Sequence, residues 1–237
     1  MRLGFMHGTR YIEFDVAFRK RKTIQISITP PNEIKVSVPR GMSEENIIDI
    51  VKIKANWIEK KILYFKDIKY EKINRKFINN EPFMYLGRSY LLQIEVDKNI
   101  KDPQVKLFQG KIYVYTSIKD KRIIQGAMEK WYREKTKEKV EERVKYYLHL
   151  FKKEPRSIRI KQQKRIWASC TYRDDLLFNW RCVMARPDVL DYIIVHEMCH
   201  MHHKNHSKDY WNMVESIIPD YRDKKEWLKI HGYKMIL

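Results

Sequence analysis

Residues 195–206 read VHEMCHMHHKNH and contain the strongest functional signal in the chain. Within this stretch, residues 196–200 have the form HExxH. On an α-helix, side chains at positions i and i+4 lie on the same face, so two imidazoles can bind one zinc ion while the adjacent glutamate faces the open coordination position. The stretch therefore predicts a metal-binding helix with His196 and His200 as ligands and Glu197 as the catalytic general base.

The residues before the motif indicate that this helix is buried. Pro187 and Asp188 are typical of a helix start, and residues 188–195 (DVLDYIIV) are mostly apolar. We therefore interpret the two histidines as part of a site rather than as ordinary surface residues.

A third ligand is expected after the helix. His206 lies six residues beyond His200, which is the offset of the last histidine in the HExxHxxGxxH pattern. His203 replaces the glycine that usually permits the turn between them. Asn205 in a left-handed conformation, or Ser207 as the cap of the next helix, would then make the turn. We favour His206 as the third ligand.

Two other residues compete with His206 for the metal. His203 would share the ligand face if the helix ran on without interruption, and Glu215 would supply a carboxylate. His202 and His231 are expected not to bind the metal. Tyr210 is a candidate hydrogen-bond donor to the transition state.

Alternation and helical periodicity predict an α+β fold with strands concentrated toward the N-terminus. Three N-terminal strands are expected to form an antiparallel meander, and one long helix with a buried stripe should follow from Ser43 to Phe65. The predicted strands are Tyr11–Phe18, Thr23–Thr29, Glu33–Val38, Pro82–Asp97, Lys111–Thr116, Ser157–Ile160, Arg165–Cys170 and Leu176–Trp180.

A second helical region is expected from Asp120 to Lys153, and an amphipathic helix should follow the histidines. We divide the chain into a β-rich N-terminal part with one long helix, residues 1–100, and a metal-binding part, residues 101–237. No internal repeat and no clear flexible linker is visible in the sequence.

The composition is that of a basic globular protein. The 237 residues include 49 Lys and Arg against 30 Asp and Glu, for a formal net charge of +19. Hydrophobic residues at 43% and aromatic residues at 13% exclude a disordered polycation. Residues 119–165, hereafter the basic cluster, hold 17 Lys and Arg against 7 Asp and Glu. This cluster predicts weak, sequence-independent binding of nucleic acid or another polyanion, unless its lysines pair with glutamates along the helix.

Cysteine usage and hydropathy predict the compartment. Three cysteines, Cys170, Cys182 and Cys199, do not form the even framework of a small secreted scaffold, so a reducing environment is expected. The N-terminus lacks the apolar core of a signal peptide, and no stretch approaches the roughly 18 apolar residues needed to cross a bilayer. We therefore expect a cytoplasmic protein with no membrane partner; the composition leaves its oligomeric state open.

The sequence around the motif resembles the YgjP-like metallopeptidase family, a zincin-type group of bacterial and archaeal proteins. The resemblance covers most of the chain and is carried by residues 164–170 (KRIWASC), 176–187 (LLFNWRCVMARP), 191–211 (DYIIVHEMCHMHHKNHSKDYW) and 219–228 (PDYRDKKEWL). Trp167, Ser169, Cys170 and Asn179 would then lie beside the metal helix, as a cleft wall or as core and turn residues. The sequence departs from the family at Ala168, where the family usually has glycine.

The resemblance implies a zincin-like fold in which the metal helix packs on a small mixed sheet. It also implies zinc as the cofactor, His196, His200 and His206 as its ligands, and Glu197 as the catalytic acid and base. The expected function is zinc-dependent hydrolysis of a peptide or protein substrate.

Two alternative functions remain open from the sequence. The first is a metal-dependent hydrolase of nucleotide phosphoanhydrides, of the pyrophosphatase type, in which lysines or arginines hold the phosphates. The second is a nucleic-acid-associated binding protein whose metal is structural. Glu197 argues against the second alternative, because a structural site does not need a carboxylate beside an open coordination position.

Overall fold

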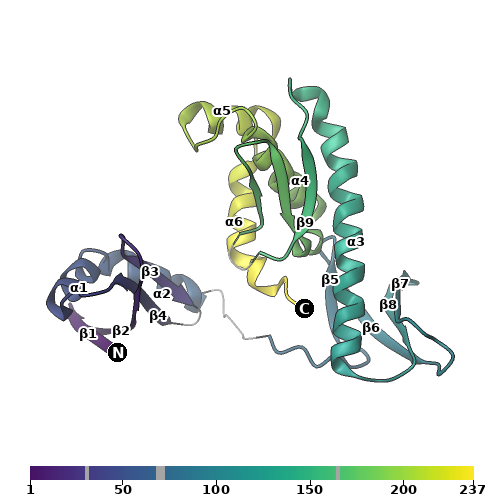
Figure 1. Ribbon diagram of the computed structural model, residues 1–237, viewed down its shortest axis with the longest axis horizontal. Coiled ribbons are helices and arrows are strands. Elements are labelled where there is room, and N and C mark those ends of the chain that lie inside the picture. Colours follow the sequence, from purple (N-terminus) through teal and green to yellow (C-terminus); the bar gives the residue numbers. More distant parts are fainter. Residues whose placement is uncertain (30–31, 68–72, 164–165) are drawn as a thin grey trace. The chain divides into compact units, whose positions relative to one another are not determined.

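The computed structural model divides the chain into two compact units, Met1–Lys72 and Ile73–Leu237 (Figure 1). It describes residues 1–29, 32–67, 73–163 and 166–237. Each unit has an apolar core of its own. The strands between residues 82 and 96 belong to the second unit, whereas a division at residue 100 would group them with the N-terminal strands.

The first unit is a four-stranded sheet with two helices packed against it. The sheet has the order β1-β2-β4-β3. Its elements are β1 (Arg2–His7), β2 (Arg10–Arg19), β3 (Gln25–Thr29), β4 (Glu33–Pro39), α1 (Glu44–Lys52) and α2 (Ala55–Asp67). Strand β1 was not predicted, although Phe5 in it belongs to the core.

The predicted antiparallel meander is wrong, because β2 and β4 are parallel neighbours. Both strands bury alternate residues and therefore occupy the centre of the sheet. Strand β3 buries none of its residues completely, so it occupies the edge and pairs with β4 alone. Alternation along the chain indicates which residues face the core but not the order of the strands.

The single helix predicted from Ser43 to Phe65 is two helices. Ser43 caps α1 as expected, since its hydroxyl accepts a hydrogen bond from the Asn46 amide at 3.4 Å. The break falls at Ile53, whose side chain is 76% exposed. Val51 before the break and Ala55 after it are both buried, so the apolar stripe continues across the break. Periodicity alone therefore could not reveal the interruption.

The second unit begins with a sheet of the same topology. Its order is β5-β6-β8-β7, with a parallel pair at the centre and antiparallel hairpins at each side. The strands are β5 (Pro82–Tyr85), β6 (Arg88–Val96), β7 (Gln104–Phe108) and β8 (Lys111–Thr116). The sequence showed no repeat, yet both units repeat this strand order; the similarity lies in pairing rather than in residue identity.

The C-terminal half of the second unit combines a small mixed sheet with four helices. The sheet has the order β10-β11-β9, so β10 is an edge strand. The elements are α3 (Lys121–Tyr147), β9 (Ser157–Lys161), β10 (Ala168–Cys170), β11 (Asp175–Asn179), α4 (Pro187–Cys199), α5 (Lys208–Ile217) and α6 (Tyr221–His231). Of the strand predicted at 165–170, Arg165 lies outside the described residues. The whole is a mixed α+β structure, as the sequence predicted.

Helix α3 runs along the second unit and joins its two sheets (Figure 1). Near the middle of the helix, the Tyr132 hydroxyl donates to the Met84 carbonyl in β5 at 2.8 Å. One turn further, the buried Thr136 hydroxyl donates to the Trp180 carbonyl at 2.6 Å. Near its C-terminus, Arg143 contacts α4. Helix α3 therefore positions α4 relative to both sheets.

The contact between α3 and α4 is a two-point ion pair. The Arg143 guanidinium donates to the two carboxylate oxygens of Asp191 at 2.6 and 2.8 Å, and the Tyr147 hydroxyl donates to the same carboxylate at 3.1 Å. Asp191 lies on α4 five residues before the first histidine of the motif, so this contact orients the helix that carries the candidate site.

Within the part of the chain that the structure describes, none of the helices is long and apolar enough to cross a membrane.

Replacing Arg143 with Met should destabilise the second unit by about 2 kcal/mol, because the half-buried Asp191 carboxylate loses its cation. The free energy of unfolding can be measured by denaturation followed by tryptophan fluorescence. Five of the six tryptophans lie in the second unit and report on it. Lys137→Gln is the control, because Lys137 is exposed and 3.9 Å from its partner Glu141. Equal effects of the two substitutions would contradict the role of the Arg143 contact.

Candidate metal centre

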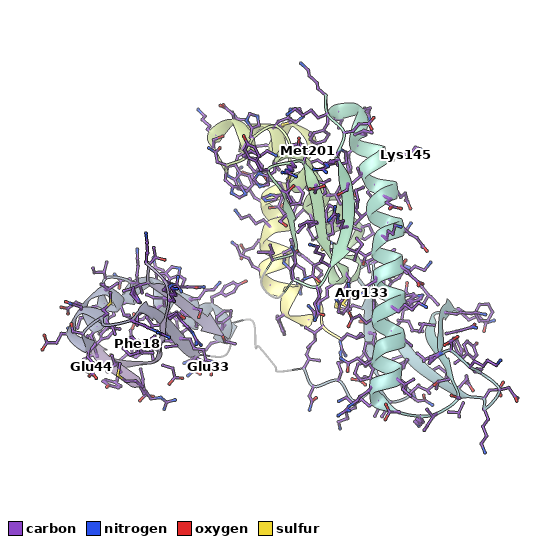
Figure 2. All side chains as sticks on the ribbon, in the orientation of Figure 1. Phe18, Glu33, Glu44, Arg133, Lys145 and Met201 are labelled. Carbon is purple, nitrogen blue, oxygen red and sulfur yellow. The ribbon has the colours of Figure 1, made fainter. Side chains whose placement is uncertain are left out.

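Helix α4 carries the first part of the candidate site. Local sequence signals set the residues at which this helix begins and ends. Pro187 occupies the first helical turn, where its missing N–H costs nothing. The helix ends at Cys199, and His200 is its C-cap residue. Most residues between are buried, which explains the apolar run before the motif. Met201, directly after the helix, is also buried, and Figure 2 shows it surrounded by other side chains.

Three imidazoles from α4 and the segment after it converge on one point. The Nε2 atom of His206 lies 3.2 Å from Nε2 of His196 and 3.2 Å from Nε2 of His200. One nitrogen from each ring lies within 4.8 Å of the others, which suits a shared metal ion. His196 and His200 are half-buried and His206 is exposed, so the cluster opens to solvent on the His206 side.

The protein environment keeps these imidazoles neutral, as a metal ligand must be. Burial, followed by the charges of His200 and His206, lowers the pKa of His196 to about 3. Burial also lowers the pKa of His200 and of His206. The Nδ1 atom of His200 lies 2.9 Å from the His203 carbonyl. Because a carbonyl only accepts, Nδ1 carries the proton and Nε2 keeps its lone pair for the cluster.

A column of aromatic rings supports the exposed ligand candidate, His206. Its ring stacks on Trp211 with centroids 5.4 Å apart, and Trp211 stacks on Tyr221 at 5.1 Å. Tyr221 in turn stacks on Tyr192 of α4 at 6.4 Å. The sequence predicts an amphipathic helix after the histidines but not this support of His206. The only signal in the sequence is that Trp211 lies five residues after His206.

Asn205 does not adopt a left-handed conformation, because it is not among the described residues with positive φ. The turn between His200 and His206 is therefore made without it. Ser207 instead caps α5, as expected, by accepting a hydrogen bond from the Tyr210 amide at 3.4 Å. Lys204 forms an ion pair with Asp174 and donates to the Thr171 carbonyl at 3.1 Å. These contacts attach the turn to the loop between β10 and β11.

Glu197 lies beside the cluster and is 5% exposed. Burial raises the pKa of its carboxyl to about 8, and a hydrogen bond from the Cys170 backbone opposes that rise. The edge strand β10 therefore supplies a main-chain donor to the carboxylate. Glu197 and His196 line the same pocket.

The competing ligand candidates lie in other surroundings. The described residues place neither His203 nor Glu215 in the cluster; the His203 carbonyl contacts His200, and Glu215 pairs with Arg222 at 3.1 Å. His202 stacks on Phe151, and His231 packs on Trp227.

Tyr210 has a structural role in the metal centre. Its side chain is buried, and its hydroxyl donates to the His196 carbonyl at 3.0 Å. Its ring stacks on His200 with centroids 4.5 Å apart. The hydroxyl is therefore already committed to the main chain of α4, which argues against the role of transition-state donor considered from the sequence.

Residues of the segments that carry the family resemblance have two different roles. Trp167 and Ala168 line a pocket beside Glu197. The Asn179 side chain donates to the carbonyls of Gln163 and Ile166 at 2.7 and 3.2 Å, so it anchors the main chain at these two residues.

All three cysteines are free, and burial raises the pKa of each thiol, for Cys170 to about 11. They therefore lack the thiolate character that a metal ligand or nucleophile needs.

Several cations of the basic cluster pair with glutamates along α3. The pairs are Arg133–Glu129 at 2.6 Å, Lys135–Glu138 and Lys139–Glu142 at 2.7 Å, and Lys137–Glu141 at 3.9 Å. These pairs neutralise part of the positive charge on the helix. Binding of nucleic acid or another polyanion to this surface stays a prediction.

Tyr210→Phe should lower the free energy of unfolding by about 1 kcal/mol, the usual contribution of one hydrogen bond. Metal content should be unchanged, because the ring that stacks on His200 is kept. Denaturation and metal analysis of the purified variant check both expectations. Loss of the metal together with a normal unfolding free energy would show that the hydroxyl acts on the site itself.

One comparison with known proteins finds a match over nearly the whole chain. The model of the YgjP-like, metallopeptidase domain family matches residues 22–231. Neither a curated protein nor a solved structure matches the chain.

Proposed function

From the premise that the chain belongs to the YgjP-like metallopeptidase domain family, we propose that it is a zinc-dependent hydrolase that cleaves peptide bonds. In this proposal His196, His200 and His206 bind the zinc ion and Glu197 is the general base. The observation that carries the proposal is the convergence of three neutral imidazoles next to a buried carboxylate.

The donor set fits zinc. Three imidazole nitrogens with one open position are typical of catalytic zinc sites. Nε2 of His206 lies 3.2 Å from Nε2 of each of the other two histidines, and the cluster contains no acidic ligand, an arrangement that a shared cation would stabilise. Nitrogen donors also disfavour magnesium and calcium, which prefer oxygen.

The fold around the site also supports the proposal. Helix α4 contacts the edge strand β10 of the small mixed sheet, which supports our proposal that this part of the chain is zincin-like. Residues 101–237 would then form the catalytic part, together with the strands that precede them in the second unit.

The catalytic chemistry follows from the residues around the cluster. A zinc ion, when bound, acts as a Lewis acid that polarises the scissile carbonyl and favours deprotonation of water. Glu197 accepts a proton from the attacking water and delivers it to the nitrogen of the leaving amine. The Cys170 main-chain donor and the burial of Glu197 hold this carboxylate in place during both transfers.

The ligand assignment predicts different effects for two neighbouring histidines. His206→Ala should reduce zinc content sharply, whereas His203→Ala should leave zinc bound because only the His203 carbonyl contacts the cluster. Zinc per chain can be measured by elemental analysis after dialysis against a weak chelator. Loss of zinc from the His203 variant, with zinc retained in the His206 variant, would refute the assignment.

Glu197→Gln should keep the zinc but lower peptide hydrolysis by about 10²–10⁴-fold, because an amide cannot accept the proton. The assay compares the variant with wild type on a panel of unstructured peptides, with nucleoside triphosphates as a second panel. Glu215→Gln is the matched control, since Glu215 is a carboxylate outside the cluster that pairs with Arg222. Hydrolysis of peptides by the Glu197 variant at the wild-type rate would remove Glu197 from the mechanism.

A further inference from the structure

A pocket of about 330 Å³ adjoins the proposed catalytic residues. His196 and Glu197 form one wall, and the rest is mostly apolar: Ile166, Trp167, Ala168, Tyr192, Ile193 and Leu228. Two lysines of α6, Lys225 and Lys229, complete the lining. The pocket thus combines space for an apolar side chain with positive charge, directly beside the reacting groups.

The tryptophan wall of this pocket packs against the C-terminal segment. Gly232 approaches the Trp167 ring so closely that an added Cβ would lie 2.7 Å from Cζ2. A side chain at this position would therefore require the indole to shift.

Lys225 differs from the other cations of α6 in lacking a carboxylate partner among the described residues. Lys224 pairs with Asp188 and Asp220, and Lys229 pairs with Glu226. The Lys225 ammonium instead lies 4.5 Å from the centroid of the Trp211 ring, the indole that supports His206. This contact holds the ammonium near the site without neutralising its charge.

Lys225 lines the same pocket as His196 and Glu197. An ammonium without a carboxylate partner can pair with an anionic group of a substrate that enters this pocket.

We infer that the pocket binds the C-terminal residue of a peptide, with its apolar side chain against Trp167 and its free carboxylate paired with Lys225. This inference rests on the proposed peptidase function and specifies its substrate as a peptide end. Lys225 and Glu197 line the same pocket, and the last peptide bond of a chain is only one residue from its terminal carboxylate, so a carboxylate held at Lys225 places that bond in the pocket that Glu197 lines. Water then adds across that bond: the acyl carbon gains the hydroxyl, the nitrogen gains the proton, and the C-terminal amino acid is released.

A binding experiment tests the pocket independently of turnover. N-acetyl-L-phenylalanine and its C-terminal amide are titrated into the purified, zinc-loaded full chain by calorimetry. The acid should bind at least tenfold more tightly than the amide, and Lys225→Gln should abolish that difference. Arg222→Gln is the control, because it removes a cation of the same helix that pairs with Glu215. Equal binding of acid and amide by wild type, or an unchanged preference in the Lys225 variant, overturns the inference.

An activity experiment separates this inference from the proposed function. The substrates are a peptide that ends in free phenylalanine, its C-terminal amide, and a longer peptide with an internal glutamate after phenylalanine. We expect rapid release of phenylalanine from the first peptide only, with KM raised about tenfold or more in Lys225→Gln. Cleavage of all three at equal rates overturns the inference and keeps the peptidase function. If wild type hydrolyses nucleoside triphosphates and none of the peptides, both the function and the inference are wrong.

Discussion

The approach of three imidazole nitrogens to within 4.8 Å of one another is the constraint on which the candidate metal centre depends. His196 and His200 come from one helical face, but His206 must return to them across a turn. Neutral imidazoles have no strong attraction for each other, so the surrounding structure must hold them together. The His203 carbonyl orients one ring, and the stack through Trp211 supports another.

That local arrangement depends on contacts far from the histidines. The ion pair between Arg143 and Asp191 attaches α4 to α3, and the Thr136 hydroxyl attaches α3 to the carbonyl of Trp180. Lys204 attaches the turn after α4 to the loop between β10 and β11. Each contact involves a charged or polar group that is at least partly buried, where the loss of a partner is costly. The site is therefore preorganised by the whole C-terminal half of the second unit.

The cations on α3 and the cation at the pocket differ in whether a carboxylate neutralises them. Along α3, lysines and arginines meet glutamates one turn away, which reduces the field expected from composition. At the pocket, Lys225 lies on an aromatic ring and has no carboxylate partner in the described structure. Whether a given lysine or arginine has a carboxylate partner is therefore a better guide to anion binding than the net charge of +19.

The sequence by itself determined the local features whose cause is local. Helical spacing placed His196, Glu197 and His200 together, Pro187 marked the start of α4, and Ser207 capped α5. Alternation located most strands, because each strand buries one of its faces. Only the tertiary structure decided the parallel pairing of β2 with β4, the repeated strand order, the aromatic support of His206 and the position of Lys225. These features join residues that are distant in the chain, and such contacts depend on how whole elements pack rather than on the pattern within any one of them.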